Sequence, residues 1–126
     1  MALTLTLTDV VVSVAHVEAI GTVAFSGTYA TSGDALNWTT LQNQIDQAAG
    51  KLVSSSMADP AFGPVWARFD SNGGSDNSYP LNRGTAASNW LMLGYAGITQ
   101  FTGGAAYPSS ALTDVVVFRA VFRKLL

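Results

Sequence analysis

Leucine and threonine alternate strictly over residues 3–8, and this pattern constrains the fold more than any other feature of the chain. An apolar side chain at every second position is typical of a β-strand with one buried face. The same period returns over residues 116–123, where one face is wholly apolar and Arg119 and Arg123 interrupt the other. Both segments predict strands, so the chain is expected to be β-dominated.

Further strands are predicted between these two segments. Asp9 marks a bend or bulge after the first strand. The continuous apolar run of residues 10–17 fits a strand buried on both faces. Shorter strand patterns follow over residues 20–25, 65–70, 89–95 and 98–101. About seven strands separated by turn residues favour an all-β sandwich or jelly-roll-like domain.

One segment changes period and predicts a short helix. Trp38, Leu41 and Ile45 recur at steps of three and four, which is the spacing of one helix face. We expect this helix over about residues 38–50, capped by the side chain at position 37 or 39. A helix of about three turns is marginal alone, so it must dock on the sheet through its apolar face.

Two polar segments are predicted to be loops. Residues 53–64 contain serines and the breakers Asp-Pro and Gly-Pro, and residues 71–88 form a longer excursion with an Asn-Gly-Gly sequence. Long loops are uncommon in compact domains and are usually functional or disordered. We therefore expect residues 71–88 to be an arm or loop that reaches a neighbouring subunit.

Length and charge point to one domain with an unusual surface. A chain of 126 residues is expected to be a single β-rich domain over residues 1–126. Charged residues are 11% of the chain and hydrophobic residues 48%, whereas an ordinary soluble domain has about 25% charged residues. Such a surface is expected to serve a protein interface, because interface centres are depleted in charge. The net charge of -2 argues against nucleic-acid binding.

The sequence contains no recognisable catalytic or metal motif. There is no cysteine, which excludes disulfides and thiolate metal sites. His16 and Glu18 have the spacing of a zinc deaminase motif, but the cysteine ligands of that motif are absent. No nucleophile turn or phosphate loop is present. The N-terminus has neither a signal peptide nor a membrane-span pattern, so we expect a protein made in the cytoplasm, without enzymatic activity or a cofactor.

Two ligand classes stay open. Residues 70–77 place oxygen ligands at spacings that suit calcium, although the closing glutamate of a calcium-binding hand is missing and a turn is the simpler account. Trp38, Trp66 and Trp90 are candidates for stacking on sugars in a carbohydrate-binding module. Tryptophans more often fill cores or anchor protein interfaces, so at least one of them is expected in the core.

A resemblance to a known class of protein lies in residues 23–36. There a strand is followed by a tyrosine, Tyr29, and then by Thr31-Ser32-Gly33-Asp34 and a leucine. The segment resembles one found in small structural proteins of tailed bacteriophages, where a strand leads into Tyr-x-Thr-Gly-Gly-(Glu/Asp)-x-Leu. The first glycine of that pair is Ser32 in this chain.

The resemblance implies a small β-rich virion component. It would most simply be a capsid decoration (cement) protein that binds the outer surface of the major capsid protein lattice and stabilises it. Such a protein would be made in the host cytoplasm and would work on the virion, as a symmetric oligomer such as a trimer. The alternatives are another virion position (a tail, collar or head-fibre base) and a carbohydrate-binding module.

For this role, the N-terminal strand and the loops are the candidate interface. Its leucines are expected either to add to the sheet edge of a neighbour or to pair within their own sheet. The second arrangement is the commoner one for a strand of this kind. The candidate interface residues are Leu3, Leu5, Leu7, Tyr29, Asp70, Asn72, Asp76 and Tyr79.

Overall fold

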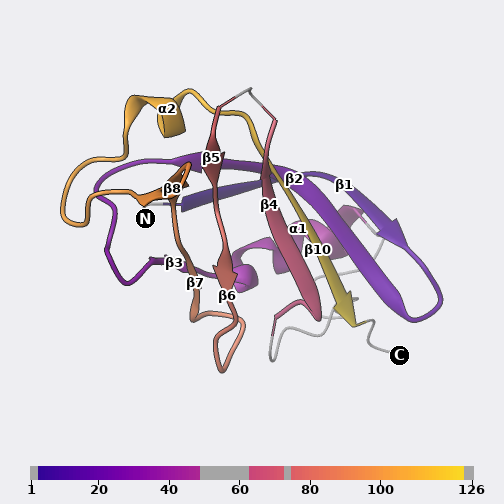
Figure 1. The fold of residues 1–126 in the computed structure, drawn as a ribbon. Helices are drawn as coiled ribbons and strands as arrows, with labels where there is room; N and C mark the ends of the chain where they lie inside the picture. The colour runs from indigo at the N-terminus through magenta and orange to yellow at the C-terminus, as the bar shows by residue number, and fades with distance from the viewer. Residues whose placement is uncertain (1–2, 49–62, 73–74, 124–126) are drawn as a thin grey trace.

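A computed structural model describes residues 3–48, 63–72 and 75–123, and the expected all-β class is confirmed (Figure 1). The largest sheet is antiparallel, with its four strands in the order β1-β2-β10-β4. Its strands are β1 (Leu3–Val12), β2 (His16–Phe25), β10 (Val116–Arg123) and β4 (Trp66–Ser71). The predicted N-terminal and C-terminal strands therefore both belong to this sheet.

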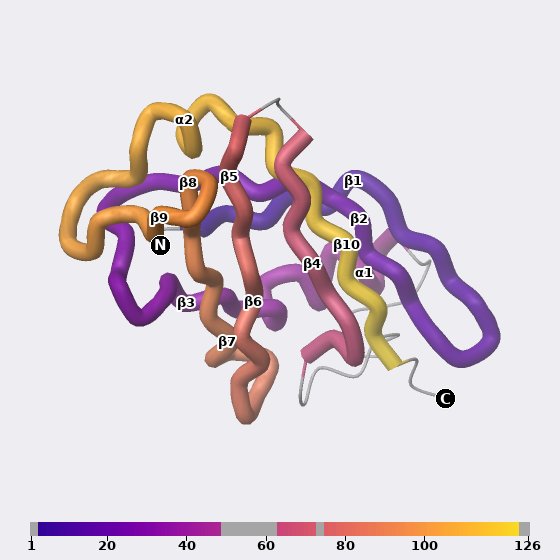
Figure 2. The backbone as a smooth tube through the Cα atoms, viewed as in Figure 1, coloured from indigo at the N-terminus to yellow at the C-terminus, as the bar shows by residue number. Residues whose placement is uncertain are grey.

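Two smaller antiparallel sheets form the second layer. They have the orders β3-β7-β6 and β5-β8-β9. Figure 2 shows β6 continuing the line of β5, and β8 continuing the line of β7, so the two sheets form one surface. A bridge between Phe69 and Tyr79 joins this surface to the β4 edge of the large sheet. The strands are β3 (Asp34–Leu36), β5 (Asn77–Ser78), β6 (Leu81–Asn82), β7 (Trp90–Met92), β8 (Tyr95–Ala96) and β9 (Thr99–Gln100).

The layers enclose one hydrophobic core that contains two groups of aromatic rings. Trp38 is the centre of the first group, with its ring edge-on to four others at centroid distances of 5.8 to 6.3 Å. Phe25 is the centre of the second group and stacks on Tyr79 at 4.9 Å and on Tyr107 at 5.0 Å. Trp38 and Trp90 are buried, which confirms that the core takes at least one tryptophan.

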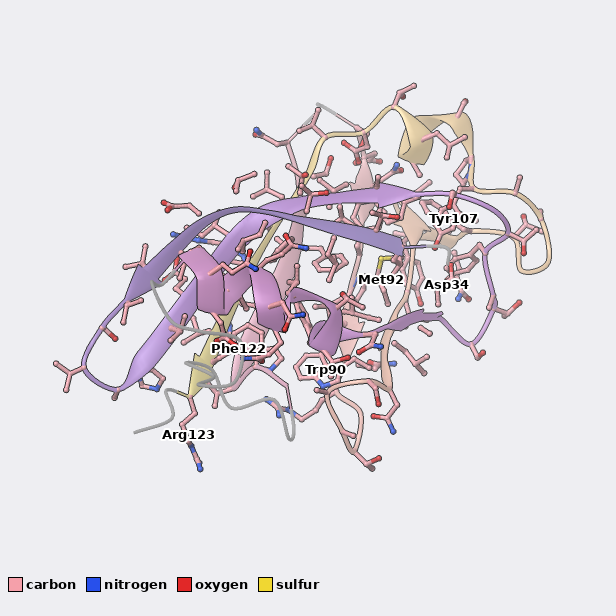
Figure 3. All side chains as sticks on the ribbon, turned by 180° about the vertical axis from the view of Figure 1, so that it is seen from behind. Asp34, Trp90, Met92, Tyr107, Phe122 and Arg123 are labelled. Atoms are coloured by element: carbon pink, nitrogen blue, oxygen red, sulfur yellow. The ribbon has the colours of Figure 1, made fainter. Side chains whose placement is uncertain are left out.

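The predicted helix is present and docks as expected. A 3₁₀ turn, η1 (Trp38–Leu41), leads into α1 (Gln42–Ala48), and the Asn37 side chain accepts a hydrogen bond from the Thr39 N–H. The apolar face is buried, and Figure 3 shows the helical segment beside Phe122 and Trp90. The expected end at residue 50 lies outside the described residues. A second helix, α2 (Ser109–Leu112), is too short to leave a periodic signal in the sequence.

The β1–β2 hairpin confirms one prediction and corrects another. The register shifts between Leu7 and Asp9, so the expected bulge is present. Residues 10–17 are not one strand buried on both faces. They comprise the end of β1, a turn and the start of β2, and the hairpin projects to the right of the other strands in Figure 1. An apolar run does not reveal this turn, because Ser13 is its only polar residue before His16.

The polar segment of residues 71–88 is not one long loop. It contains β5 and β6, and between them Tyr79 is buried in the core with 2% of its surface exposed. Asn77 is buried as well. The described part of this segment therefore contributes one strand to each sheet of the second layer and is not an arm, because Tyr79 anchors it to the core.

Candidate functional site

The tip of the β1–β2 hairpin exposes apolar side chains to solvent. Val11 and Val12, near the end of β1, are 51% and 40% exposed, and Val14 in the turn is 90% exposed. We call these three residues the hairpin tip. Fully burying an apolar side chain of this size is worth roughly 1.5 to 3 kcal/mol, so the hairpin tip retains a driving force for association.

The turn that carries the hairpin tip is held by hydrogen bonds. The Ser13 N–H donates to the carbonyl oxygen of His16 at 2.9 Å, and the Ser13 hydroxyl donates to the same oxygen at 3.1 Å. The His16 N–H donates in turn to the Ser13 hydroxyl at 3.3 Å. A turn fixed in this way lowers the entropy lost on binding, because the valines are already positioned.

The leucines of β1 lie behind this tip. Leu3 is in the core, and Leu5 and Leu7 are partly buried against it. They lie opposite residues of β2 in the hairpin register, which confirms the ordinary pairing that we weighed against addition to a neighbour. The strand is the outermost of the large sheet, so addition of a partner strand at its other edge stays a prediction.

The face of the large sheet that points away from the core carries a second candidate surface. Trp66 is 47% exposed on it, and two ion pairs cross it, Arg68 with Asp70 at 2.6 Å and Arg119 with Glu18 at 3.0 Å. Beside them lies a shallow hollow of about 380 Å³. The hollow is lined by Ile20, Asp70, Ser71, Asn72, Val117 and Arg119. Two predicted residues, Asp70 and Asn72, therefore meet here.

Asp114 organises the polar residues at the end of β4 and in the segment after it. Its carboxylate accepts hydrogen bonds from the hydroxyls of Ser71 at 2.7 Å, Ser75 at 2.8 Å and Tyr79 at 2.8 Å. The Asn77 side-chain amide donates to the Tyr79 oxygen at 3.2 Å. Each hydroxyl supplies one proton to an acceptor that takes several, so the network fastens the segment after β4 to the start of β10.

A second buried pair joins Tyr107 to Asp34, and Figure 3 shows the two side by side. The Tyr107 hydroxyl donates to the Asp34 carboxylate, which also accepts the Ala30 N–H at 3.1 Å. Burial and the hydrogen bond to Asp34 raise the pKa of Tyr107, and burial and Asp114 raise the pKa of Tyr79. Both phenols keep their protons at neutral pH, so they act as donors rather than as bases.

The remaining predicted interface residues are dispersed. Tyr29 is 1% exposed, and its hydroxyl oxygen accepts hydrogen bonds from the Gly94 N–H at 3.0 Å and from the Gln100 side chain at 2.9 Å. Tyr79 is also buried. Asp76 is exposed, and its backbone carbonyl oxygen accepts a hydrogen bond from the Gly97 N–H. Tyr29 and Tyr79 therefore contribute to the core, and neither presents its ring on the surface.

The structure gives no metal centre within the residues that it describes. No group of three or more histidine, aspartate and glutamate side chains is placed to hold an ion there. In the segment considered for calcium, Asp70 pairs with Arg68, and Ser71 and Ser75 donate to Asp114. His16 is exposed at the base of the hairpin turn. No described helix is long and apolar enough to cross a membrane.

Sequence reasoning missed the hairpin tip. Val11, Val12 and Val14 stand in the apolar run that predicted a buried strand. Exposed and buried valines look alike in a sequence. The signal that distinguishes them is the serine within the run, because a serine can close a turn by bonding nearby backbone groups.

Comparison with known proteins adds no family assignment. The chain was compared with protein-family models, with curated protein sequences and with solved structures, and none of the three comparisons gave a significant match. The fold and surfaces therefore define the class that can be stated, a β-dominated domain with an apolar hairpin tip and a solvent-facing sheet.

Proposed function

We propose that this chain is a virion structural protein of a tailed bacteriophage, a capsid decoration protein that binds the outer surface of the major capsid protein lattice. The observation that carries the proposal is the hairpin tip, three exposed valines on a turn fixed by Ser13. The resemblance of residues 23–36 to phage structural proteins supports the choice of partner. The protein would be made in the host cytoplasm and work on the virion as a trimer.

The mechanism is mechanical and follows from the hairpin tip. A projecting hairpin can enter a groove between neighbouring capsid subunits and remove its valines from water. Burial of all three would supply a few kcal/mol per contact. A trimer would repeat that contact on adjacent subunits, and linked contacts bind far more tightly than single ones. Low overall charge suits such an interface.

The proposal is tested with the capsids of the phage that encodes the chain. Purified protein is added to capsids that lack it, and bound protein is measured after sedimentation. We expect saturable binding at a fixed ratio to the major capsid protein and a higher melting temperature of the decorated capsid. Detection of the chain in tails and not in capsids of purified virions would overturn the capsid assignment.

A further inference from the structure

We propose that the outward face of the large sheet holds a binding site for a neutral oligosaccharide. This proposal is independent of the virion role, because it rests on a different surface from the hairpin tip. The site consists of Ile20, Trp66, Arg68, Asp70, Asn72 and Arg119.

The strand register places these groups in a line. Trp66, Arg68 and Asp70 occupy alternate positions of β4 and share one face. Trp66 and Asp70 are then about 13 Å apart along the strand, which is enough for a short oligosaccharide. Arg119 of β10 lies opposite Arg68 on one side and Ile20 of β2 on the other, so the site is several strands wide.

The aromatic end of the site supplies a stacking platform. The Trp66 side chain is 47% exposed, whereas Trp38 and Trp90 are buried in the core. The Arg68 guanidinium lies over the Trp66 ring, with its central carbon 5.9 Å from the ring centroid. A sugar ring has one face of C–H groups, and an exposed indole offers that face a flat apolar surface at low cost in conformational entropy.

The polar end matches hydroxyl groups. Sugar hydroxyls both donate and accept, so they need donors and acceptors side by side. The Arg68–Asp70 pair supplies both, and the Asn72 side chain, exposed at the hollow, is an amide that does the same. Asp70, Asn72 and Arg119 also line the hollow of about 380 Å³, a size in the usual range of ligand sites.

The charges of this face favour a neutral ligand. Within the site, Arg68 is paired with Asp70 and Arg119 with Glu18, so these two cations are balanced by two anions. The other arginine of this face, Arg123, lies at the far end of β10 and outside the site. A phosphate or an acidic peptide would need uncompensated positive charge, which these pairs do not offer. A second copy of the chain is also disfavoured, because the centre of this face is charged and interface centres are depleted in charge.

The test is a titration of the full chain with neutral hexasaccharides of glucose, mannose, xylose and N-acetylglucosamine, and with a heparin hexasaccharide as the anionic probe. Tryptophan fluorescence and calorimetry report binding, and Trp66 is the exposed reporter. We expect at least one neutral hexasaccharide to bind and to shift the emission, and we expect no binding of the heparin probe.

Variants assign the binding to this face. Trp66→Ala should weaken the affinity at least tenfold, and Trp66→Tyr should retain part of it. Val65→Ala is the matched control, because Val65 is equally exposed at the neighbouring position. Asp70→Ala and Arg119→Ala provide a second route if Trp66→Ala does not fold.

Three results would overturn the proposal. The first is that no neutral hexasaccharide binds, and the second is that binding is unchanged in Trp66→Ala and in both polar variants. The third is that Trp66→Ala lowers the mass of an oligomer in solution, which would make this face an interface between copies of the chain.

Discussion

At the scale of single residues, Asp114 does the most to position the loops. Three hydroxyls, one from the last residue of β4 and two from the segment that follows it, donate to its carboxylate. The sequence of this segment predicted a free polar loop, because serine, asparagine and aspartate are common both in free loops and in loops that are anchored to the fold. An anchored loop differs from a free one in having a hydrogen-bond acceptor from a distant part of the chain. Sequence spacing does not reveal that the Asp114 carboxylate lies beside these hydroxyls.

Removal of the Asp114 carboxylate should therefore destabilise the fold. We expect Asp114→Ala to lower the free energy of unfolding by about 2 to 4 kcal/mol, because Ser71, Ser75 and Tyr79 lose their acceptor. Asp114→Asn keeps an acceptor oxygen and should cost about 1 kcal/mol. Urea unfolding of the wild type and of the two variants measures these losses. An Asp114→Ala variant as stable as the wild type would contradict the structural role of Asp114.

The buried tyrosines predict sensitivity to alkali. The pKa values of Tyr79 and Tyr107 are raised in the folded state from an ordinary value of 10.0, so above that pH the unfolded chain loses protons that the folded chain keeps. Stability is then fully present below about pH 10 and falls above it by about 1.4 kcal/mol per pH unit for each tyrosine. Urea midpoints between about pH 8 and pH 11 measure the slope. Tyr79→Phe should reduce the slope of stability against pH by half. An unchanged slope would contradict the assignment of this pH dependence to the buried tyrosines.

At the scale of elements, the β1–β2 hairpin depends on Gly21. A Cβ at this position would lie 2.1 Å from the Thr6 carbonyl oxygen and 2.5 Å from the Phe118 ring. We expect Gly21→Ala to cost about 3 kcal/mol, because β1 or the core must shift to make room. Thr22→Ala, at the exposed neighbouring position, is the control and should change stability by about 0.5 kcal/mol at most. Thermal melts of the two variants measure these losses of stability, and a Gly21→Ala variant as stable as Thr22→Ala would contradict the prediction.

The strands and helices also show which parts of the fold could be predicted from sequence patterns. Alternation identified the first and last strands, and the spacing of Trp38, Leu41 and Ile45 identified the helix, because these patterns reflect which face is buried. Strands of two or three residues such as β5 and β8 are too short to show a period. The outward face of the large sheet was only partly anticipated, since Asp70 and Arg119 are distant in sequence and meet through strand pairing.

At the scale of the whole molecule, the proposed role requires self-association. We expect light scattering to give a mass three times the 13.2 kDa of one chain over a range of concentrations. The trimer supplies the repeated contact that makes weak single contacts strong on a symmetric lattice. A stable monomer at every concentration would contradict the trimer and would leave single-site binding to be measured directly.

The most direct test of the account is the effect of the hairpin tip on capsid binding. A chain carrying Val11→Ser, Val12→Ser and Val14→Ser loses the exposed apolar surface, and its core is unchanged because none of the three side chains belongs to the core. Leu112→Ser, which removes a side chain of similar exposure (53%) on α2, is the matched control. In co-sedimentation with undecorated capsids, we predict that the triple variant binds at least tenfold more weakly than the wild type at an unchanged melting temperature, and that Leu112→Ser binds like the wild type. Unchanged binding by the folded triple variant would contradict the proposed function.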